Sequence, residues 1–93
     1  MLVARRFLVS GRVQGVGYRF FAYEAAEIEG VSGWVANRAG GRVEVWIEGD
    51  AEAVLRVERL IRRGPPAARM DAVDAGDEAP SGRHTGFDIR SGG

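Results

Sequence analysis

A glycine-rich segment near the start of the chain has the composition of an anion-binding loop. It reads Gly11-Arg12-Val13-Gln14-Gly15-Val16-Gly17. Glycine allows backbone conformations in which consecutive N–H groups point into one concavity, and such concavities bind phosphate. A helical pattern begins directly afterwards at Tyr18, so the loop leads into a helix N-terminus. The unpaired N–H groups and the partial positive charge at that terminus also favour an anion.

Arg19 would lie in the first turn of this helix and could add a positive charge to the loop. Its guanidinium is always ionised, and its planar fork matches two oxygens of a phosphate group. Without a ligand, a cation at a helix N-terminus opposes the helix dipole and costs about 0.3 kcal/mol or more. A bound phosphoryl group would explain why an arginine stands there.

The loop matches neither of two common nucleotide-binding motifs. The chain contains no Lys, which a Walker A loop requires. Phe20 stands where the third glycine of a dinucleotide-binding fingerprint would fall. Taken by itself, a glycine-rich loop between a strand and a helix is commonly no more than a tight connection.

Hydrophobic periodicity and turn residues predict the elements that would position this loop. The clearest strand is 43–48, where valine and isoleucine alternate with glutamate and tryptophan, as in a sheet covered on one face. Asp50 is placed to cap the helix that follows, and Gly64 to end it. The expected strands are 2–10, 32–38, 43–48, 70–73 and 87–90, the expected helices are 18–29 and 51–63, and 74–86 is expected to be a polar loop.

The order strand, helix, strand, strand, helix, strand predicts an α+β fold of the ferredoxin-like, split βαβ type. Its two helices would pack on one face of an antiparallel or mixed sheet, and 87–90 would add a short extra strand at the C-terminal end. Because the chain has 93 residues and neither a repeat nor a linker, we expect a single domain over residues 1–93.

This topology predicts that two distant parts of the sequence meet. The first two strands of a split βαβ unit are parallel, so their carboxyl ends lie at the same edge of the sheet. The glycine loop leaves the first of these ends, and Asn37 stands at the second, an arrangement typical of ligand sites in sheets with helical crossovers. Asn37 could equally be a residue of the turn 37–41, in which Gly40 and Gly41 can take positive φ.

Charge and cysteine content exclude several functions. The chain has 13 basic and 13 acidic residues, and every basic residue is an arginine. It therefore lacks the broad positive field that drives binding to nucleic acid or anionic membranes. The absence of cysteine excludes a disulfide framework, a thiolate metal site and a cysteine nucleophile. Arg5 and Arg6 interrupt the short apolar start, so it is neither a signal peptide nor a membrane span, and a cytoplasmic location is expected.

Two segments together resemble the signatures of the acylphosphatase family. The first runs from Gly11 to Arg19, and the second is Gly33-Trp34-Val35-Ala36-Asn37, continuing to Gly41-Arg42-Val43-Glu44. The spacing between the segments also fits, and looser similarity extends over nearly the whole chain. Two positions depart from the family pattern: Glu29 stands where a leucine is usual, and Gly40 replaces a common aspartate.

The resemblance implies a ferredoxin-like enzyme that hydrolyses acyl phosphates to a carboxylate and inorganic phosphate without metal or cofactor. Arg19 would hold the phosphoryl group and Asn37 would position the attacking water. The phosphate cradle would consist of Gln14, Gly15, Val16, Gly17, Tyr18 and Arg19. The residues are consistent with this chemistry, because a carboxylate leaving group with a pKa of about 4 needs no general acid.

Two other functions are compatible with the same fold. One is a non-catalytic, anion-binding module, and the other is an RNA-binding sheet, against which the zero net charge and the few aromatic residues argue. We expect Trp46 to cover the open sheet face and His84, the single histidine, to be a solvated bystander. The expected partners are a small-molecule acyl phosphate and inorganic phosphate, bound by a monomer, with no nucleic acid or membrane.

Overall fold

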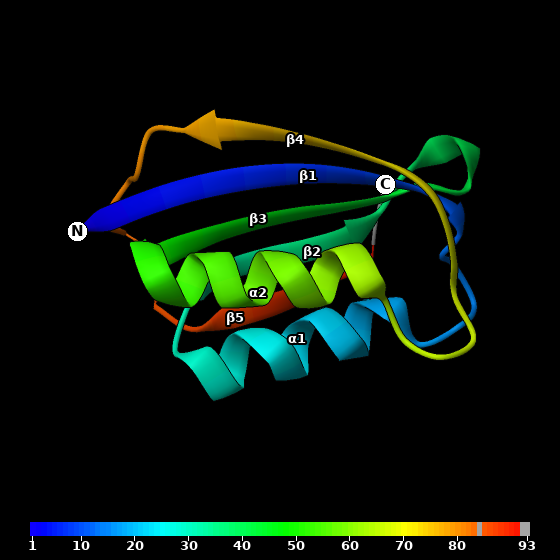
Figure 1. Cartoon of the computed structure of the whole chain (residues 1–93), viewed down its shortest axis with the longest axis horizontal. Coiled ribbons are helices and arrows are strands. Elements are labelled where there is room, and N and C mark those ends of the chain that lie inside the picture. Colours follow the sequence, from blue (N-terminus) through cyan, green and yellow to red (C-terminus); the bar gives the residue numbers. More distant parts are fainter. Residues whose placement is uncertain (84, 92–93) are drawn as a thin grey trace.

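A five-stranded sheet carries both helices on one of its faces in the computed structural model, which describes residues 1–83 and 85–91 (Figure 1). The order of the strands across the sheet is β4-β1-β3-β2-β5. The elements are β1 (Leu2–Arg12), α1 (Tyr18–Glu29), β2 (Ser32–Asn37), the 3-10 turn η1 (Ala39–Gly41), β3 (Val43–Asp50), α2 (Ala51–Arg63), β4 (Arg69–Glu78) and β5 (Phe87–Arg90).

The topology confirms the predicted ferredoxin-like fold. β3 pairs antiparallel with both β1 and β2, so these two strands are parallel and their carboxyl ends share one edge of the sheet. β5 adds to β2 in parallel as the expected extra strand, and β4 pairs antiparallel with β1 at the opposite side. The helix α1 connects the two parallel strands, which brings the loop before it to their common edge.

The core lies between the sheet and the helices, as strand alternation predicts. Phe7 and Val9 on β1, and Val45 and Ile47 on β3, are fully buried on the face toward the helices. The helices contribute small or branched residues to the same cluster, among them Ala22, Ala26, Val57 and Ile61. Burial of a large apolar side chain contributes about 1.5–3 kcal/mol, so this cluster is the main source of stability.

β4 is longer than the sequence indicates, and residues 74–78 belong to it rather than to a loop. It is an edge strand that pairs with β1 along its length, from Arg12 opposite Arg69 to Ala4 opposite Glu78. Most of its side chains are exposed, so acidic and small residues are tolerated there. The alternating apolar pattern by which a strand is recognised in a sequence is therefore missing. The backbone ladder with β1, and not local propensity, determines its extent.

Two smaller points complete the comparison with the expected elements. β2 ends at Asn37, one residue earlier than expected. His84 lies outside the residues that the structure describes.

β1 continues through Gly11 to Arg12, two residues beyond its expected end. The pairing with β4 shifts between Ser10 and Gly11, and Gly11 has φ of 125°. A Cβ at this glycine would lie 2.1 Å from the carbonyl oxygen of Arg69. Only glycine fits this position, because the position requires a positive φ and the backbone of β4 approaches it closely.

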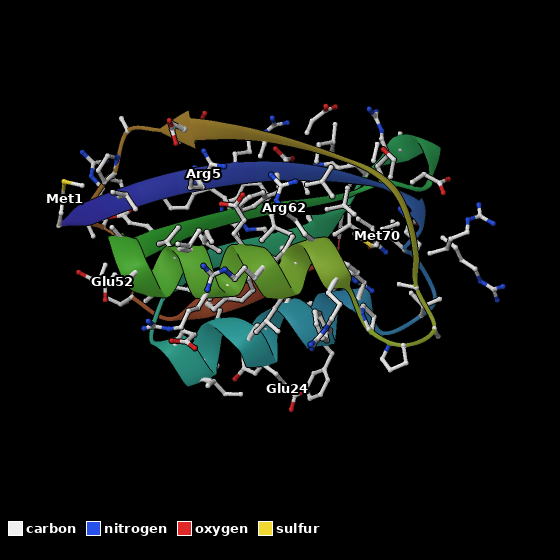
Figure 2. All side chains as sticks on the ribbon, in the orientation of Figure 1. Met1, Arg5, Glu24, Glu52, Arg62 and Met70 are labelled. Atoms are coloured by element: carbon white, nitrogen blue, oxygen red, sulfur yellow. The ribbon has the colours of Figure 1, made fainter. Side chains whose placement is uncertain are left out.

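The start of α2 is capped as predicted and also holds the N-terminus of the chain. The Asp50 side chain accepts a hydrogen bond from the Glu52 backbone N–H at 3.2 Å. The ammonium group of Met1 contacts the same carboxylate at 3.2 Å, and the Ala51 N–H donates to the Met1 carbonyl at 2.9 Å. Met1 and Glu52 accordingly lie at the same end of the molecule (Figure 2). The ammonium group and the capping bonds lower the pKa of Asp50 below its ordinary value.

An ion pair between the helices explains the unusual residue at position 29. Glu29 accepts a hydrogen bond from the Arg56 Nε of α2 at 2.7 Å, and its carboxylate is mostly covered. The neighbouring Ile28 is 80% exposed and contributes no packing at this turn. The last turn of α1 is therefore attached to α2 by charge instead of by the apolar contact that a leucine would make.

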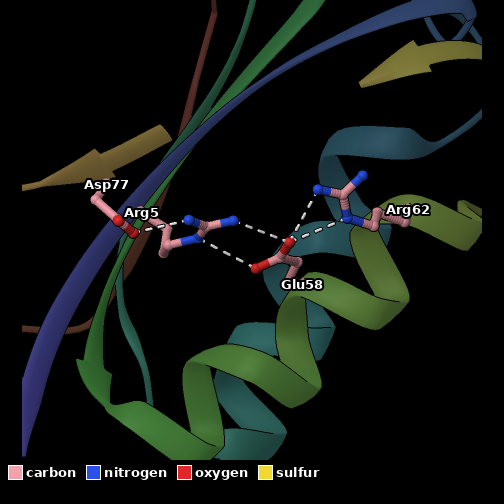
Figure 3. Close-up of polar contacts among 4 residues, drawn as sticks. All are labelled: Arg5, Glu58, Arg62 and Asp77. Atoms are coloured by element: carbon pink, nitrogen blue, oxygen red, sulfur yellow. Dashed lines mark hydrogen bonds and ion pairs between the residues drawn. The ribbon is translucent and has the colours of Figure 1, made fainter. Parts of the chain in front are cut away.

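A second charge cluster links α2 and β4 to β1 (Figure 3). Arg5 of β1 donates to both carboxylate oxygens of Glu58, at 3.2 and 3.1 Å, and to Asp77 of β4 at 2.7 Å. Arg62, one turn further along α2, donates to Glu58 at 3.0 Å. The hydrogen bonds that Arg5 donates to Asp77 and Glu58 raise the pKa of Arg5 above its ordinary value. This cluster holds the edge strand and the helix at the rim of the core.

The sheet face opposite the helices is lined by paired charges and two tryptophans. Glu44 is 9% exposed because it accepts hydrogen bonds from Arg6 and Arg38, which lie on either side of it. Trp46 is half-buried on this face and stands directly opposite Trp34 of β2. Glu48 on the same face is 4% exposed and accepts hydrogen bonds from Ser81 and from the Gly82 N–H, so both carboxylates are largely covered.

We expect Glu44→Gln to lower the free energy of unfolding by about 1–2 kcal/mol at pH 7, because two charge-assisted hydrogen bonds are lost. Burial alone would raise the pKa of Glu44, but the hydrogen bonds and charges of Arg38 and Arg6 outweigh it and lower the pKa. A lowered native pKa adds stability above the ordinary value of 4.5, and this stability is lost as pH falls through the native pKa.

The difference between the wild type and Glu44→Gln should therefore shrink as the pH falls below that ordinary value. Urea unfolding at a series of pH values measures it. The matched control is Glu78→Gln on exposed β4, for which we expect a change within about 0.5 kcal/mol. A wild-type advantage that stays constant down to strongly acidic pH would contradict the role given to the ion pairs.

Candidate active site

The loop between β1 and α1 has the backbone conformation that the sequence predicts for an anion-binding concavity. Gly15 and Gly17 have φ of 73° and 78°, whereas Val16 between them does not have a positive φ. A Cβ on either glycine would meet no atom within 4 Å. The two glycines are therefore required by the left-handed backbone and not by close packing, and such alternation of backbone conformation is typical of N–H nests.

The N-terminus of α1 is open to a ligand. Gly17 is its N-cap, no side chain caps it, and the first turn has no acidic residue. The first helical hydrogen bond runs from the Phe21 N–H to the Gly17 carbonyl at 3.0 Å. The N–H groups of 18–20 precede that bond and have no hydrogen-bond partner within the part of the chain that the structure describes. The helix end thus offers donors and partial positive charge beside the glycine loop.

Arg19 extends from the first turn of α1 to the end of β5. Its Nη1 donates to the backbone carbonyl of Arg90 at 2.9 Å, and within residues 1–83 and 85–91 it has no carboxylate partner. Arg90 stands opposite Ala36 in the parallel pairing of β5 with β2, and Ala36 precedes Asn37. The hydrogen bond therefore holds the guanidinium near the edge where β2 and β5 end, with its charge not neutralised by an acid.

Asn37 is the last residue of β2 and is half-buried. Successive side chains of a strand point to opposite faces, so Asn37 lies on the same face of β2 as Val35. Val35 is buried in the core, on the side of the helices. Its carboxamide forms no hydrogen bond to any residue that the structure describes. The structure thus brings the end of β2 with Asn37, the start of α1 with Arg19 and the glycine loop to one edge of the sheet.

The side chain of Gln14 bridges the glycine loop and the turn after β2. Its Nε2 donates to the backbone carbonyls of Arg38 and Arg42 at 2.9 and 2.8 Å. In the same turn the Arg38 N–H donates to the Arg42 carbonyl at 2.7 Å, and Gly40 and Gly41 have the expected positive φ. Sequence reasoning placed Gln14 in the cradle but missed this bridge, because nothing local indicates which carbonyls a side-chain amide will reach.

Tyr18 anchors the first turn of α1 in the core. Its side chain is 1% exposed, and its hydroxyl donates to the carbonyl of Ile61 in α2 at 2.7 Å. Ile61 lies in the last turn of α2, and the residue four positions later, which would donate to its carbonyl if the helix continued, is Pro65, which has no N–H. Tyr18 supplies the missing donor, and burial raises its pKa well above the ordinary value, so the hydroxyl stays neutral. Tyr18 can contribute only its backbone N–H to an anion site.

Neither a metal centre nor a membrane helix is found in the described part of the chain. Residues 1–83 and 85–91 contain no group of three or more His, Cys, Asp or Glu side chains that could hold a metal ion. Among these residues, no helix is long and apolar enough to cross a bilayer.

The fold and the site define a small α+β protein with a glycine loop and an uncapped helix N-terminus at the carboxyl ends of its parallel strands. A family model described as acylphosphatase matches residues 5–89, and the chain belongs to the acylphosphatase family. The chain is 49% identical to the acylphosphatase of Rubrobacter xylanophilus, over 91% of this chain and 77% of the relative. It is 46% identical to that of Anaeromyxobacter dehalogenans, over 95% of each chain.

The structural comparison agrees with the sequence comparison. The crystal structure of acylphosphatase from Bacillus subtilis superposes with a TM-score of 0.90 at 34% identity, covering 97% of this chain and 99% of that one. The match therefore includes every element that builds the edge described above.

Proposed function

We propose that this chain hydrolyses the carboxyl–phosphate bond of acyl phosphates, with the phosphoryl group held by the 14–19 loop and Arg19. Acylphosphatase activity follows from its family and from relatives of that name that match over most of their length. No observation favours the non-catalytic, anion-binding alternative. The observation that carries the assignment of residues is the common position of Arg19, Asn37 and an uncapped helix N-terminus at one sheet edge.

The loop and Arg19 would stabilise the charge of the transferred phosphoryl group. Phosphoryl transfer depends mainly on positioning and on electrostatic stabilisation of the phosphoryl oxygens. The backbone N–H groups of Gly15, Val16 and Gly17 and those of the first turn of α1 would bind these oxygens. Arg19, fixed by its bond to the Arg90 carbonyl, would bring the remaining guanidinium N–H groups to the same oxygens.

Asn37 would hold the attacking water in line with the leaving group. Its carboxamide has both a donor and an acceptor and has no competing partner among the described residues. The water oxygen forms a bond to phosphorus, and the bond from phosphorus to the acyl oxygen breaks. Its electron pair leaves with the carboxylate, and a proton of the water goes to the released phosphate or to solvent. The carboxylate leaves unprotonated, because its pKa is about 4.

Further properties are part of the same proposal. The reaction needs no metal or cofactor, since Arg19 and the backbone amides supply the positive charge. One hydrophobic cluster takes side chains from both helices and four strands, which supports a single domain over residues 1–93. The site is assembled from one copy of the chain, which supports a monomer, and we retain the cytoplasmic location expected from the sequence.

Hydrolysis of benzoyl phosphate should proceed at the same rate with and without an excess of a strong chelator. Inorganic phosphate should raise the apparent KM and leave kcat unchanged, because product and substrate compete for the same loop. Sulfate-free buffers of constant ionic strength are the control. Activity that is lost with chelator and restored by magnesium would contradict the metal-free mechanism. Noncompetitive inhibition by phosphate would mean that the loop is not the phosphoryl site.

A further inference from the structure

Both N–H bonds of the Gln14 carboxamide are used to join two separate parts of the site. The acceptors are the carbonyls of Arg38 and Arg42, at 2.9 and 2.8 Å, which stand on either side of the turn η1. Since Nε2 has only two hydrogens, its capacity as a donor is filled by these bonds. The side chain of Gln14 is therefore not available to the phosphoryl group.

The bridge lies where the sheet no longer connects the loop to β2. The pairing of β1 with β3 ends at Val9 opposite Val43, and the pairing of β2 with β3 ends at Asn37 opposite the same Val43. Beyond Val9, β1 pairs only with β4, on the side away from β2. Gln14, the first residue of the cradle, thus bonds to Arg38, the residue after Asn37. This bond lies beyond the point where the backbone ladder ends.

We propose that Gln14 is a positioning residue that sets the place of Asn37, and hence of its water, relative to the phosphate cradle. This inference rests on the roles proposed for Arg19 and Asn37. An in-line attack depends on the distance and angle between water and phosphorus, and a displacement of about 1 Å can cost about 10²-fold in rate. Two hydrogen bonds to the carbonyls that flank the turn, one before it and one after it, fix the turn in both position and orientation.

The cradle has other supports besides Gln14, so phosphate binding and the positioning of Asn37 can be tested separately. Val13 before it and Tyr18 at its end are each 1% exposed and packed in the core. The Tyr18 hydroxyl bond to Ile61 adds a further anchor. Loss of the Gln14 bridge should therefore leave phosphate binding nearly intact while it releases the turn that carries Asn37.

The test replaces Gln14 with Met, which has a similar length and no donor, and with Glu, whose carboxylate would repel both carbonyls. We expect either variant to lower kcat for benzoyl phosphate by about 10–100-fold. The affinity for inorganic phosphate, measured by calorimetry, should change less than about threefold. Normal kcat in both variants would overturn the proposal, and so would parallel losses of kcat and phosphate affinity, which would mean that Gln14 supports the cradle.

A double-mutant cycle with Asn37→Ala distinguishes positioning of Asn37 from a general structural role. If Gln14 acts through Asn37, Gln14→Met should slow the Asn37→Ala variant by less than about twofold. An undiminished 10–100-fold effect in that background would overturn the proposal while leaving the role of Asn37 in place. Full turnover of Asn37→Ala alone would overturn both, whereas slow Asn37→Ala with normal Gln14→Met would overturn only the positioning role.

Discussion

Arg19→Ala is expected to abolish both turnover and phosphate binding. The substitution removes the only side-chain cation assigned to the phosphoryl group, and an arginine in this role is worth about 10³-fold or more in rate. Its effect on folding should be small, because the lost hydrogen bond ends on the exposed carbonyl of Arg90. Turnover of benzoyl phosphate and phosphate affinity by calorimetry measure the two losses. Arg59→Ala, which removes an exposed arginine of α2, is the matched control.

Arg19→Lys separates charge from geometry at the same position. Lysine keeps one positive charge but loses the planar fork and most of its donors, so rate and phosphate affinity should both fall. It also lacks the second arm that would keep the bond to the Arg90 carbonyl while binding an anion. Near-normal activity in this variant would mean that charge alone suffices and that bidentate binding is wrong.

Asn37→Ala is expected to lower kcat by about 10²–10³-fold, the scale for removing one preorganised polar group from an active site. Phosphate affinity should remain near that of the wild type, since Asn37 is assigned to the water and not to the phosphoryl oxygens. The free energy of unfolding should also change little, because a polar residue at a strand end contributes little to the core. Turnover, calorimetry with phosphate and urea unfolding on one preparation give all three values.

Two outcomes would contradict the role of Asn37 in different ways. If Asn37→Ala binds phosphate as poorly as Arg19→Ala, Asn37 is a phosphate ligand and not a water-positioning residue. If the variant keeps full turnover, the common edge of β1 and β2 does not make Asn37 part of the reaction. The contrast between the Asn37 and Arg19 variants is therefore more informative than either variant alone.

Local patterns were sufficient for most of the fold. Both helices and the strands β3 and β5 occupy the residues expected for them, apart from the last two residues of β3. These elements are encoded by periodicity, by a capping aspartate and by glycines at helix ends, all of which act over a few residues. The site could be outlined for the same reason: Gly15 and Gly17 specify their own backbone, and the topology rule brings the ends of two parallel strands together.

The tertiary structure decided the contacts between residues that are distant in the sequence. β4 is a strand over residues 74–78 because β1 offers it a backbone ladder, although its exposed side chains have no strand pattern. Glu29 is accommodated because Arg56 of the other helix reaches it. Pro65 indicates from sequence that the carbonyl of Ile61 lacks its helical donor, but only the packing of the helices shows that Tyr18 supplies one.

Gln14 shows the same division within the site. Its type and its place after Val13 mark it as part of the glycine-rich loop, and that much the sequence determines by itself. Its two bonds to the turn after β2 depend on the register of three strands and on where their ladders end. Sequence determines what is local, namely periodicity, caps and glycine turns. Register and side-chain partners are set by the packing of the whole chain, so only the folded structure reveals how the two halves of the site are held together.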